Sequence, residues 1–167
     1  MVIIDIINGD ILNAKESYIC HQCNCVTKTS YGLSKSISNK YIWADIYKTR
    51  SENKQNVQEL DEPGTIIELE DPIDPNKFHK VICFMSQIGP RKPNTYKKLY
   101  LNIYNDTYEN RKKWFRDCLH ILDENNYETV AMPYGIGCGL AGGKWDEYIK
   151  MLEECQTKIV LYKFSKT

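Results

Sequence analysis

The stretch Met132-Pro-Tyr-Gly-Ile-Gly-Cys-Gly-Leu140 carries the strongest structural signal in the chain. Its glycines stand at alternate positions, directly after residues 129–132, whose apolar run predicts a short strand. Glycine has no Cβ atom, so its backbone can approach a ligand closely. Exposed amides that lead into a helix N-terminus form a nest for an anion such as a diphosphate. A tight turn between a strand and a helix would need the same glycines, so the loop alone leaves both interpretations open.

Strands and helices alternate on both sides of this loop. Apolar runs predict strands at residues 2–7, 18–25, 65–69, 80–86 and 158–162, and the polar residues 51–62 predict a loop. Helical spacing of apolar residues predicts helices from Leu33 through Ile37, Tyr41 and Ala44, over residues 101–124, and over residues 145–152. Such alternation is typical of an α/β protein. We expect one domain over residues 1–167, a three-layer α/β/α sandwich with a mixed, mostly parallel sheet.

Composition narrows the classes of function. The 22 basic and 22 acidic residues balance to a net charge of zero, which argues against non-specific nucleic-acid binding. No apolar run approaches the roughly 20 residues that a membrane span requires. The N-terminal residues resemble a strand rather than a signal peptide, and the seven cysteines then fit a reducing compartment. We therefore expect a cytoplasmic protein that makes no membrane contact, and we expect a monomer.

A dense group of possible metal ligands occurs at Cys20, His21, Cys23 and Cys25. Structural zinc sites usually combine two ligand pairs, each on a turn. Here the group lies on a predicted strand, where alternate side chains face opposite ways, so Cys20 should point away from Cys23 and Cys25. No second pair follows at a suitable spacing. The sequence therefore predicts neither a metal nor another cofactor.

Three features follow the carboxyl ends of predicted strands, where ligands bind in open α/β sheets. They are Asp10, Asn24 and the glycine loop of residues 135–140. Asp10 could accept a hydrogen bond from a purine amino group, and Asn24 could hold a ribose hydroxyl. Each also has an ordinary structural interpretation, because aspartate and asparagine commonly serve as turn or helix-cap residues.

Taken together, these segments resemble the macro domain, an ADP-ribose-binding fold. The resemblance rests on Gly9-Asp-Ile-Leu12, on His21-Gln-Cys-Asn-Cys25 with Gly32-Leu-Ser34, and on the 132–140 stretch with Trp145, and it covers nearly the whole chain in order. The His-x-Cys-Asn-Cys and Ile-Gly-Cys-Gly-Leu patterns are similar to the branch that holds ADP-ribose 1″-phosphate phosphatases and terminal ADP-ribose protein glycohydrolases.

The resemblance implies a role for each part of the site. Asp10 would read the adenine amino group beside the Ile11 amide, and Tyr162 would offer an aromatic contact. Asn24 and residues 27–33, with Tyr31, Gly32 and Leu33, would surround the distal ribose. The diphosphate would lie in the cradle formed by the backbone of Gly135, Ile136, Gly137, Cys138, Gly139 and Leu140. Core packing is the alternative role for Tyr162.

Two departures from the family pattern bear on mechanism. The glycohydrolases place an aspartate where this chain has Ala141, and their lysine falls near Ser86 or Gln87. A lysine-plus-aspartate mechanism is therefore not expected. The first hypothesis is instead substrate-assisted hydrolysis at C1″ of ADP-ribose, in which Asn24 and His21 position the ribose and the diphosphate orients the water. A buried, hydrogen-bonded histidine is the alternative for His21. If the substrate is the 1″-phosphate, Lys28 could neutralise charge.

Two further classes of function stay open at this stage. A non-catalytic module could use the same pocket to read or sequester ADP-ribose, because affinity and turnover depend on most of the same residues. A generic nucleotide-binding α/β domain would share only the glycine loop and the layered fold.

Overall fold

The computed structural model describes residues 4–52, 61–76, 79–95 and 104–165. The described strands are β1 (Ile4–Asn8), β2 (Tyr18–Asn24), β3 (Thr65–Leu69), β4 (Lys80–Gln87), β5 (Thr129–Pro133) and β6 (Lys158–Lys163). The described helices are α1 (Gly32–Lys40), α2 (Ile46–Glu52), α3 (Tyr108–Glu124) and α4 (Trp145–Glu154), with short 3-10 turns η1 (Ile11–Asn13) and η2 (Ile42–Ala44). None of these helices combines the length and the apolar character that a bilayer span requires.

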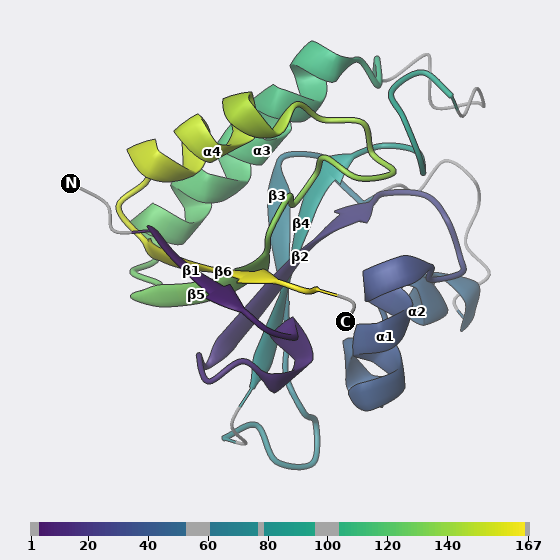
Figure 1. The fold of residues 1–167 in the computed structure, drawn as a ribbon. Helices are drawn as coiled ribbons and strands as arrows, with labels where there is room; N and C mark the ends of the chain where they lie inside the picture. Colours follow the sequence, from purple (N-terminus) through teal and green to yellow (C-terminus); the bar gives the residue numbers. More distant parts are fainter. Residues whose placement is uncertain (1–3, 53–60, 77–78, 96–103, 166–167) are drawn as a thin grey trace.

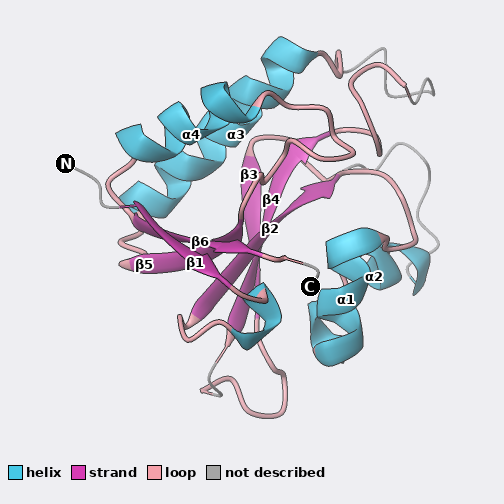
Figure 2. Cartoon of the chain, in the orientation of Figure 1, coloured by secondary structure: helices cyan, strands magenta, loops and turns pink. Residues whose placement is uncertain are grey.

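The strands form a six-stranded sheet in the order β1-β6-β5-β2-β4-β3. Every neighbouring pair is parallel except β3 and β4, which are antiparallel. Helices α3 and α4 cover one face of the sheet, and α1 and α2 lie against the other (Figures 1 and 2). The predicted three-layer sandwich with a mixed, mostly parallel sheet is thus confirmed.

Side-chain alternation along the central strands builds a core on each face of the sheet. On β4, Cys83 and Met85 pack toward α1 and α2, whereas Ile82 and Phe84 pack toward α3 and α4. A strand that is covered on both faces reads as a continuous apolar run, as residues 81–85 do. The apolar stripe predicted for α3 at Phe115, Cys118, Leu119 and Leu122 is buried in the second of these cores.

The predicted helix through Leu33 and Ala44 is wrong in its length. Helix α1 ends at Lys40, and Tyr41 is extended at φ −123° and ψ 92° before the short turn η2 begins. The apolar spacing persists across two separate elements because both pack on the same face of the sheet. Helix α2 was also missed, and the predicted loop 51–62 overlaps its last two residues. The signal for α2 is Asp45, whose carboxylate accepts from the Lys48 amide at 3.0 Å as an N-cap.

Helix α3 begins later than the spacing predicts. Thr107 is its N-cap, with the side-chain oxygen accepting from the Asn110 amide at 3.1 Å. Residues 104–107 precede the helix, and residues 101–103 of the predicted helix lie outside the described residues. A capping threonine competes with helix continuation at its own position, so the apolar pattern upstream does not extend the helix.

Candidate functional site

Four neighbouring parallel strands present their carboxyl ends at one edge of the sheet. In spatial order they are β1, β6, β5 and β2. Asp10 follows β1, the glycine loop follows β5, and Asn24 ends β2. Three inter-strand spacings separate β1 from β2, which is a distance of about 14 Å. The three features predicted from the sequence are therefore brought together along a single line.

Asp10 stands at the β1 end of this line. Its Oδ1 accepts from the Leu12 amide at 2.9 Å, which makes Asp10 the N-cap of η1. Within the described chain, its second carboxylate oxygen accepts no hydrogen bond. Ile11, the next residue, is buried and fixes η1 in the core. Asp10 thus has both the structural role and an oxygen left for a ligand.

Two aromatic residues, Tyr162 and Phe164, lie at the end of β6, and they differ in burial: one packs in the core and the other is exposed. Tyr162 is buried in the core, and its hydroxyl donates to Glu16 Oε1 at 2.6 Å. Burial and this bond raise the pKa of the Tyr162 hydroxyl. Phe164, by contrast, is 64% exposed. The Gly9 amide donates to the Lys163 carbonyl at 3.0 Å, so Phe164 directly follows the residue that pairs with the turn before Asp10. The sequence reasoning missed Phe164, although an aromatic residue past the last buried strand position is a readable signal.

The glycines of the 135–140 loop serve two different purposes. An added Cβ at Gly137 would lie 2.8 Å from both Gln22 Oε1 and the Tyr148 ring, and Gly137 has φ +78°. Gly143 is equally confined, since its Cβ would lie 2.5 Å from the Gly137 carbonyl oxygen. These two glycines are required for packing against α4. At Gly135 and Gly139, however, an added Cβ would meet no atom within 4 Å. The backbone is bare on this open side.

Several amides of the loop are left unused. Turn bonds within the loop occupy the amides of Ile136 and Cys138, which donate to the Pro133 and Gly135 carbonyls at 3.0 and 2.9 Å. Five others donate to no acceptor in the described part of the chain, namely those of Gly135, Gly137, Gly139, Leu140 and Ala141. Consecutive free amides in turns that include positive-φ glycines form an anion-binding concavity.

The positive end of helix α4 does not add to this concavity as the sequence suggested. The helix begins only at Trp145, after Lys144 as its N-cap, so residues 141–144 separate it from the loop. Its first turn also carries Asp146 and Glu147, whose charges offset the helix dipole. Turn amides, rather than a helix terminus, supply the donors.

The loop after β2 is folded around Asn24. The Asn24 Oδ1 atom accepts from the Val26 and Thr27 amides at 3.0 and 2.9 Å, and its Nδ2 donates to Thr27 Oγ1 at 3.0 Å. Tyr31 is 71% exposed, Gly32 has φ +57°, and Leu33 is half-buried at the start of α1. The Asn24 side chain is therefore engaged by its own turn, and Lys28 is exposed on the same loop.

Two arginines that sequence reasoning overlooked brace the loops of the site. Arg50 of α2 donates to the carbonyls of Asn24 and Thr27 at 2.8 and 3.0 Å while it binds Asp61. Arg111 of α3 is 1% exposed and forms an ion pair with the buried Asp106 at 2.6 Å.

Arg111 also reaches three backbone carbonyls, those of Arg91, Ala141 and Gly89, at 2.6, 3.1 and 3.2 Å. Asp106 in turn accepts from the Gly89 amide at 2.9 Å. This network joins the glycine loop at Ala141 to the segment after β4. At the positions where the resemblance would place a lysine and an aspartate, the chain has the buried Ser86 and Gln87 and the backbone-anchored Ala141.

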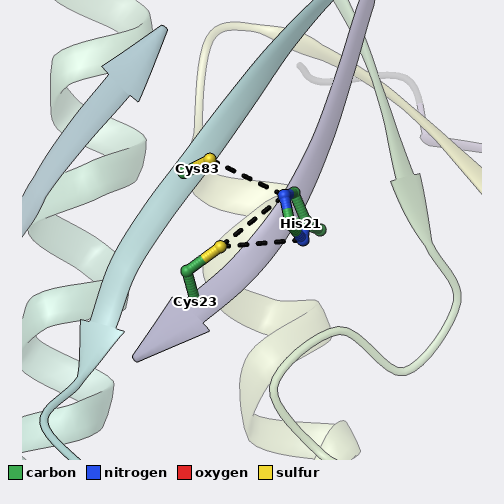
Figure 3. A group of neighbouring side chains, drawn as sticks. All are labelled: His21, Cys23 and Cys83. Carbon is green, nitrogen blue, oxygen red and sulfur yellow. Dashed lines mark hydrogen bonds between the residues drawn. The ribbon is translucent and has the colours of Figure 1, made fainter. Parts of the chain in front are cut away.

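His21 lies in the core beneath the loop and not on its surface. It is 3% exposed, and its Nδ1 atom lies 3.1 Å from Ser34 Oγ on α1. The sulfur atoms of Cys23 and Cys83 each lie 3.6 Å from His21 Nε2 (Figure 3). Cys20 faces the opposite core, as the strand alternation predicts.

Cys23 and Cys83 form an unequal pair of thiols. Burial opposes ionisation of Cys23, but its hydrogen bond with Cys83 and the neighbouring His21 ring outweigh burial and lower the pKa of Cys23 well below its ordinary value. The same hydrogen bond, together with burial, raises the pKa of Cys83 well above its ordinary value.

Comparisons with known proteins identify the fold. The sequence matches no protein-family model and none of the curated proteins. Among solved structures, the chain is similar to the macrodomain of Mycobacterium tuberculosis DarG, with a TM-score of 0.64, 17% identity, and coverage of 97% of this chain and 98% of that one. The macrodomain of Thermus aquaticus DarG has a TM-score of 0.64 at 14% identity, with 99% and 100% covered. A variant of the Oceanobacillus iheyensis macrodomain with ADPR has a TM-score of 0.55 at 18% identity, with 95% and 83% covered.

Proposed function

We propose that this chain, which has the macrodomain fold, binds ADP-ribose along the carboxyl edge of its sheet and hydrolyses an ADP-ribose derivative at the distal ribose. The observation that carries the proposal is the linear order of features at that edge. A free carboxylate oxygen, an exposed aromatic ring, a cradle of free amides and a polar loop follow strands β1, β6, β5 and β2 in turn. Adenine, diphosphate and distal ribose occur in the same order in ADP-ribose. An ADPR complex of a structurally similar macrodomain supports this ligand.

At the adenine end, Asp10 can act without losing its structural role. Oδ1 continues to cap η1 while Oδ2 accepts from the adenine amino group, and the Ile11 amide lies beside it. Phe164 is better placed than Tyr162 to contact the base, because the Tyr162 hydroxyl is held by Glu16 and its ring is buried. Aromatic rings favour such contacts through their faces and edges.

In the middle of the ligand, the diphosphate would be held by main-chain amides. The free amides of the loop, from Gly135 to Ala141, supply hydrogen bonds to anionic oxygens without bringing side-chain bulk. Arg111 helps to hold the loop in this conformation, because its guanidinium donates a hydrogen bond to the Ala141 carbonyl. Preorganised donors lose little conformational freedom when the ligand binds.

At the distal ribose, the reaction forms a bond between water and C1″ as the bond from C1″ to the attached group breaks. The leaving group takes up the proton that the water gives, and the product is ADP-ribose. Asn24, Tyr31, Gly32 and Leu33 would surround this ribose, and the bound diphosphate would orient the water. We assign His21 an indirect role, because its buried ring is bound to Ser34 and so sets the position of α1.

The turnover test uses ADP-ribose 1″-phosphate, an ADP-ribosylated protein and an ADP-ribosylated DNA as substrates. We expect release of ADP-ribose from at least one of them. Asn24→Ala should lower the rate by about 100-fold, the scale of one positioned polar group at a reacting centre. Thr27→Val is the matched variant, since it keeps the Thr27 amide that Asn24 binds and should have a much smaller effect.

A non-catalytic reader is the second candidate, and one observation favours it. The Asn24 amide is already committed to its own turn, and the position after Leu140 holds an alanine rather than a carboxylate. Tight calorimetric binding of ADP-ribose without product from any of the three substrates would establish the reader and exclude the hydrolase.

Adenine recognition is tested by Asp10→Asn. Asparagine keeps the oxygen that caps the Leu12 amide but replaces the free carboxylate oxygen with a donor. A hydrogen bond to a charged group is worth about 1.5 to 3 kcal/mol, so calorimetry should show ADP-ribose affinity falling by about 10- to 100-fold. The inosine analogue, which lacks the amino group, is the control ligand. If Asp10→Asn weakened both ligands equally, Asp10 would not read the amino group.

A further inference from the structure

We propose that His21, Cys23 and Cys83 form a buried site for a single Zn²⁺ ion. The ion would link β2 to β4 beneath the loop that follows β2. The three side chains come from the neighbouring strands β2 and β4 (Figure 3). They lie on the face that α1 covers, where His21 contacts Ser34. Their ligand atoms all lie within 4.8 Å of one another. The proposal is independent of ADP-ribose binding, because it rests on the core and not on the edge of the sheet.

The distances in the cluster match those between ligands of one zinc ion. Zn–S bonds of about 2.3 Å and Zn–N bonds of about 2.1 Å at a tetrahedral angle place sulfur and nitrogen about 3.6 Å apart. Both sulfur atoms are 3.6 Å from His21 Nε2, and the Cys23 sulfur lies at the same distance from Nδ1. Small rotations of the two thiol side chains would let these three ligands occupy three of the four positions of a tetrahedral zinc ion.

The cluster offers a metal ion one nitrogen lone pair and two sulfur atoms. The Nδ1 atom of His21 is directed at Ser34 Oγ at 3.1 Å, and a ring that donates there has a single lone pair left, on Nε2. Two buried thiols lie beside that one acceptor and also form a hydrogen bond with each other. A metal ion uses the same lone pair together with both sulfur atoms. The contact with Ser34 is then the outer hydrogen bond that orients a metal-binding imidazole.

Charge balance favours a divalent thiophilic ion such as Zn²⁺ over Cu⁺. The three ligands are 3%, 1% and 0% exposed, so an uncompensated charge at this position would be costly. Two thiolates and a neutral imidazole around Zn²⁺ give no net charge, whereas the same ligands around Cu⁺ leave one negative charge. The sequence prediction of no metal considered only Cys20, His21, Cys23 and Cys25. It could not include Cys83, which strand pairing brings in from 62 residues away.

The direct test is metal analysis of the full-length protein purified under reducing conditions from zinc-containing medium. We expect one zinc per chain by mass spectrometry. After refolding with Co²⁺, an absorption band from thiolate-to-cobalt charge transfer should appear. Neither measurement depends on a variant. Absence of both zinc and the cobalt band would overturn the site, and stoichiometric copper would overturn the choice of zinc.

Variants identify the ligands. Cys83→Ser and Cys23→Ser should each abolish the cobalt band, whereas Cys20→Ser, on the same strand but facing the other core, should keep it. Ser34→Ala should retain the band but weaken zinc binding by about 10- to 100-fold in competition with a chelator. If Cys20→Ser lost the metal as fully as Cys83→Ser, the three-residue site would be wrong.

Discussion

Replacement of Arg111 by methionine is expected to lower the free energy of unfolding by about 3 to 5 kcal/mol, the cost of removing one partner of a buried ion pair. Arg111 and Asp106 side chains are both only 2% exposed, so the Asp106 carboxylate would stay buried without its cation. Methionine fills a similar volume, and the loss would therefore come from charge and hydrogen bonding more than from a cavity. Urea unfolding at low temperature measures the change.

The same helix offers a matched control. Lys113 forms an ion pair with Asp117 at 3.3 Å, but its side chain is 66% exposed. Exposed pairs of this kind contribute about 0.3 to 0.5 kcal/mol, so Lys113→Met should leave unfolding almost unchanged. Adding Asp106→Asn to Arg111→Met removes the stranded charge and should restore part of the stability. If Arg111→Met and Lys113→Met lowered the free energy of unfolding by the same amount, the buried network would not be what stabilises this region.

The effect of Arg111→Met should extend to the ligand site. The Arg111 guanidinium holds the Ala141 carbonyl at the end of the glycine loop and the Arg91 carbonyl opposite. Without it the free amides lose a fixed support, and ADP-ribose would have to order them on binding. Calorimetry on the folded variant should show weaker affinity with a larger entropic penalty.

The elements of the fold were readable from local patterns because each pattern has a direct physical cause. Strand β4 is apolar at consecutive positions since both of its faces are covered, and the stripe of α3 repeats at helical spacing since one face is buried. The first helix was predicted too long for the same reason, because Tyr41 and Ala44 pack on the sheet without belonging to α1.

The residues that hold the loops of the site in place could not be predicted from local sequence patterns. Arg111 stands in the charged run Asn110-Arg-Lys-Lys113, where a solvated helix face is the ordinary interpretation. Its partners are backbone carbonyls in loops, and such contacts leave no pattern in sequence. Cys83 joins His21 only through the pairing of β2 with β4, and strand order is a property of the whole sheet. The sequence thus indicates which loops meet but not what holds them.

Gly139→Val should block ADP-ribose binding while it leaves the fold intact. Gly139 has no positive φ, and an added Cβ would meet no atom within 4 Å, so valine fits the protein without strain. Its branched side chain would instead occupy the open side of the loop, where the diphosphate is proposed to lie. Forcing extra carbon atoms into a fitted contact costs about 1 to 3 kcal/mol, which corresponds to a loss of affinity of about 5- to 150-fold.

Gly137→Ala is the contrasting variant on the same loop. Its Cβ would lie 2.8 Å from Gln22 and Tyr148 at a φ of +78°, so this smaller change should lower the melting temperature markedly. Calorimetric titration with ADP-ribose and thermal unfolding together separate the two effects. Gly139→Val should change affinity alone, because that glycine lies on the open side of the loop, where we propose that the diphosphate binds, whereas an added Cβ at Gly137 meets Gln22 and Tyr148. Normal ADP-ribose affinity in Gly139→Val would place the diphosphate elsewhere and remove the main-chain cradle from the proposal.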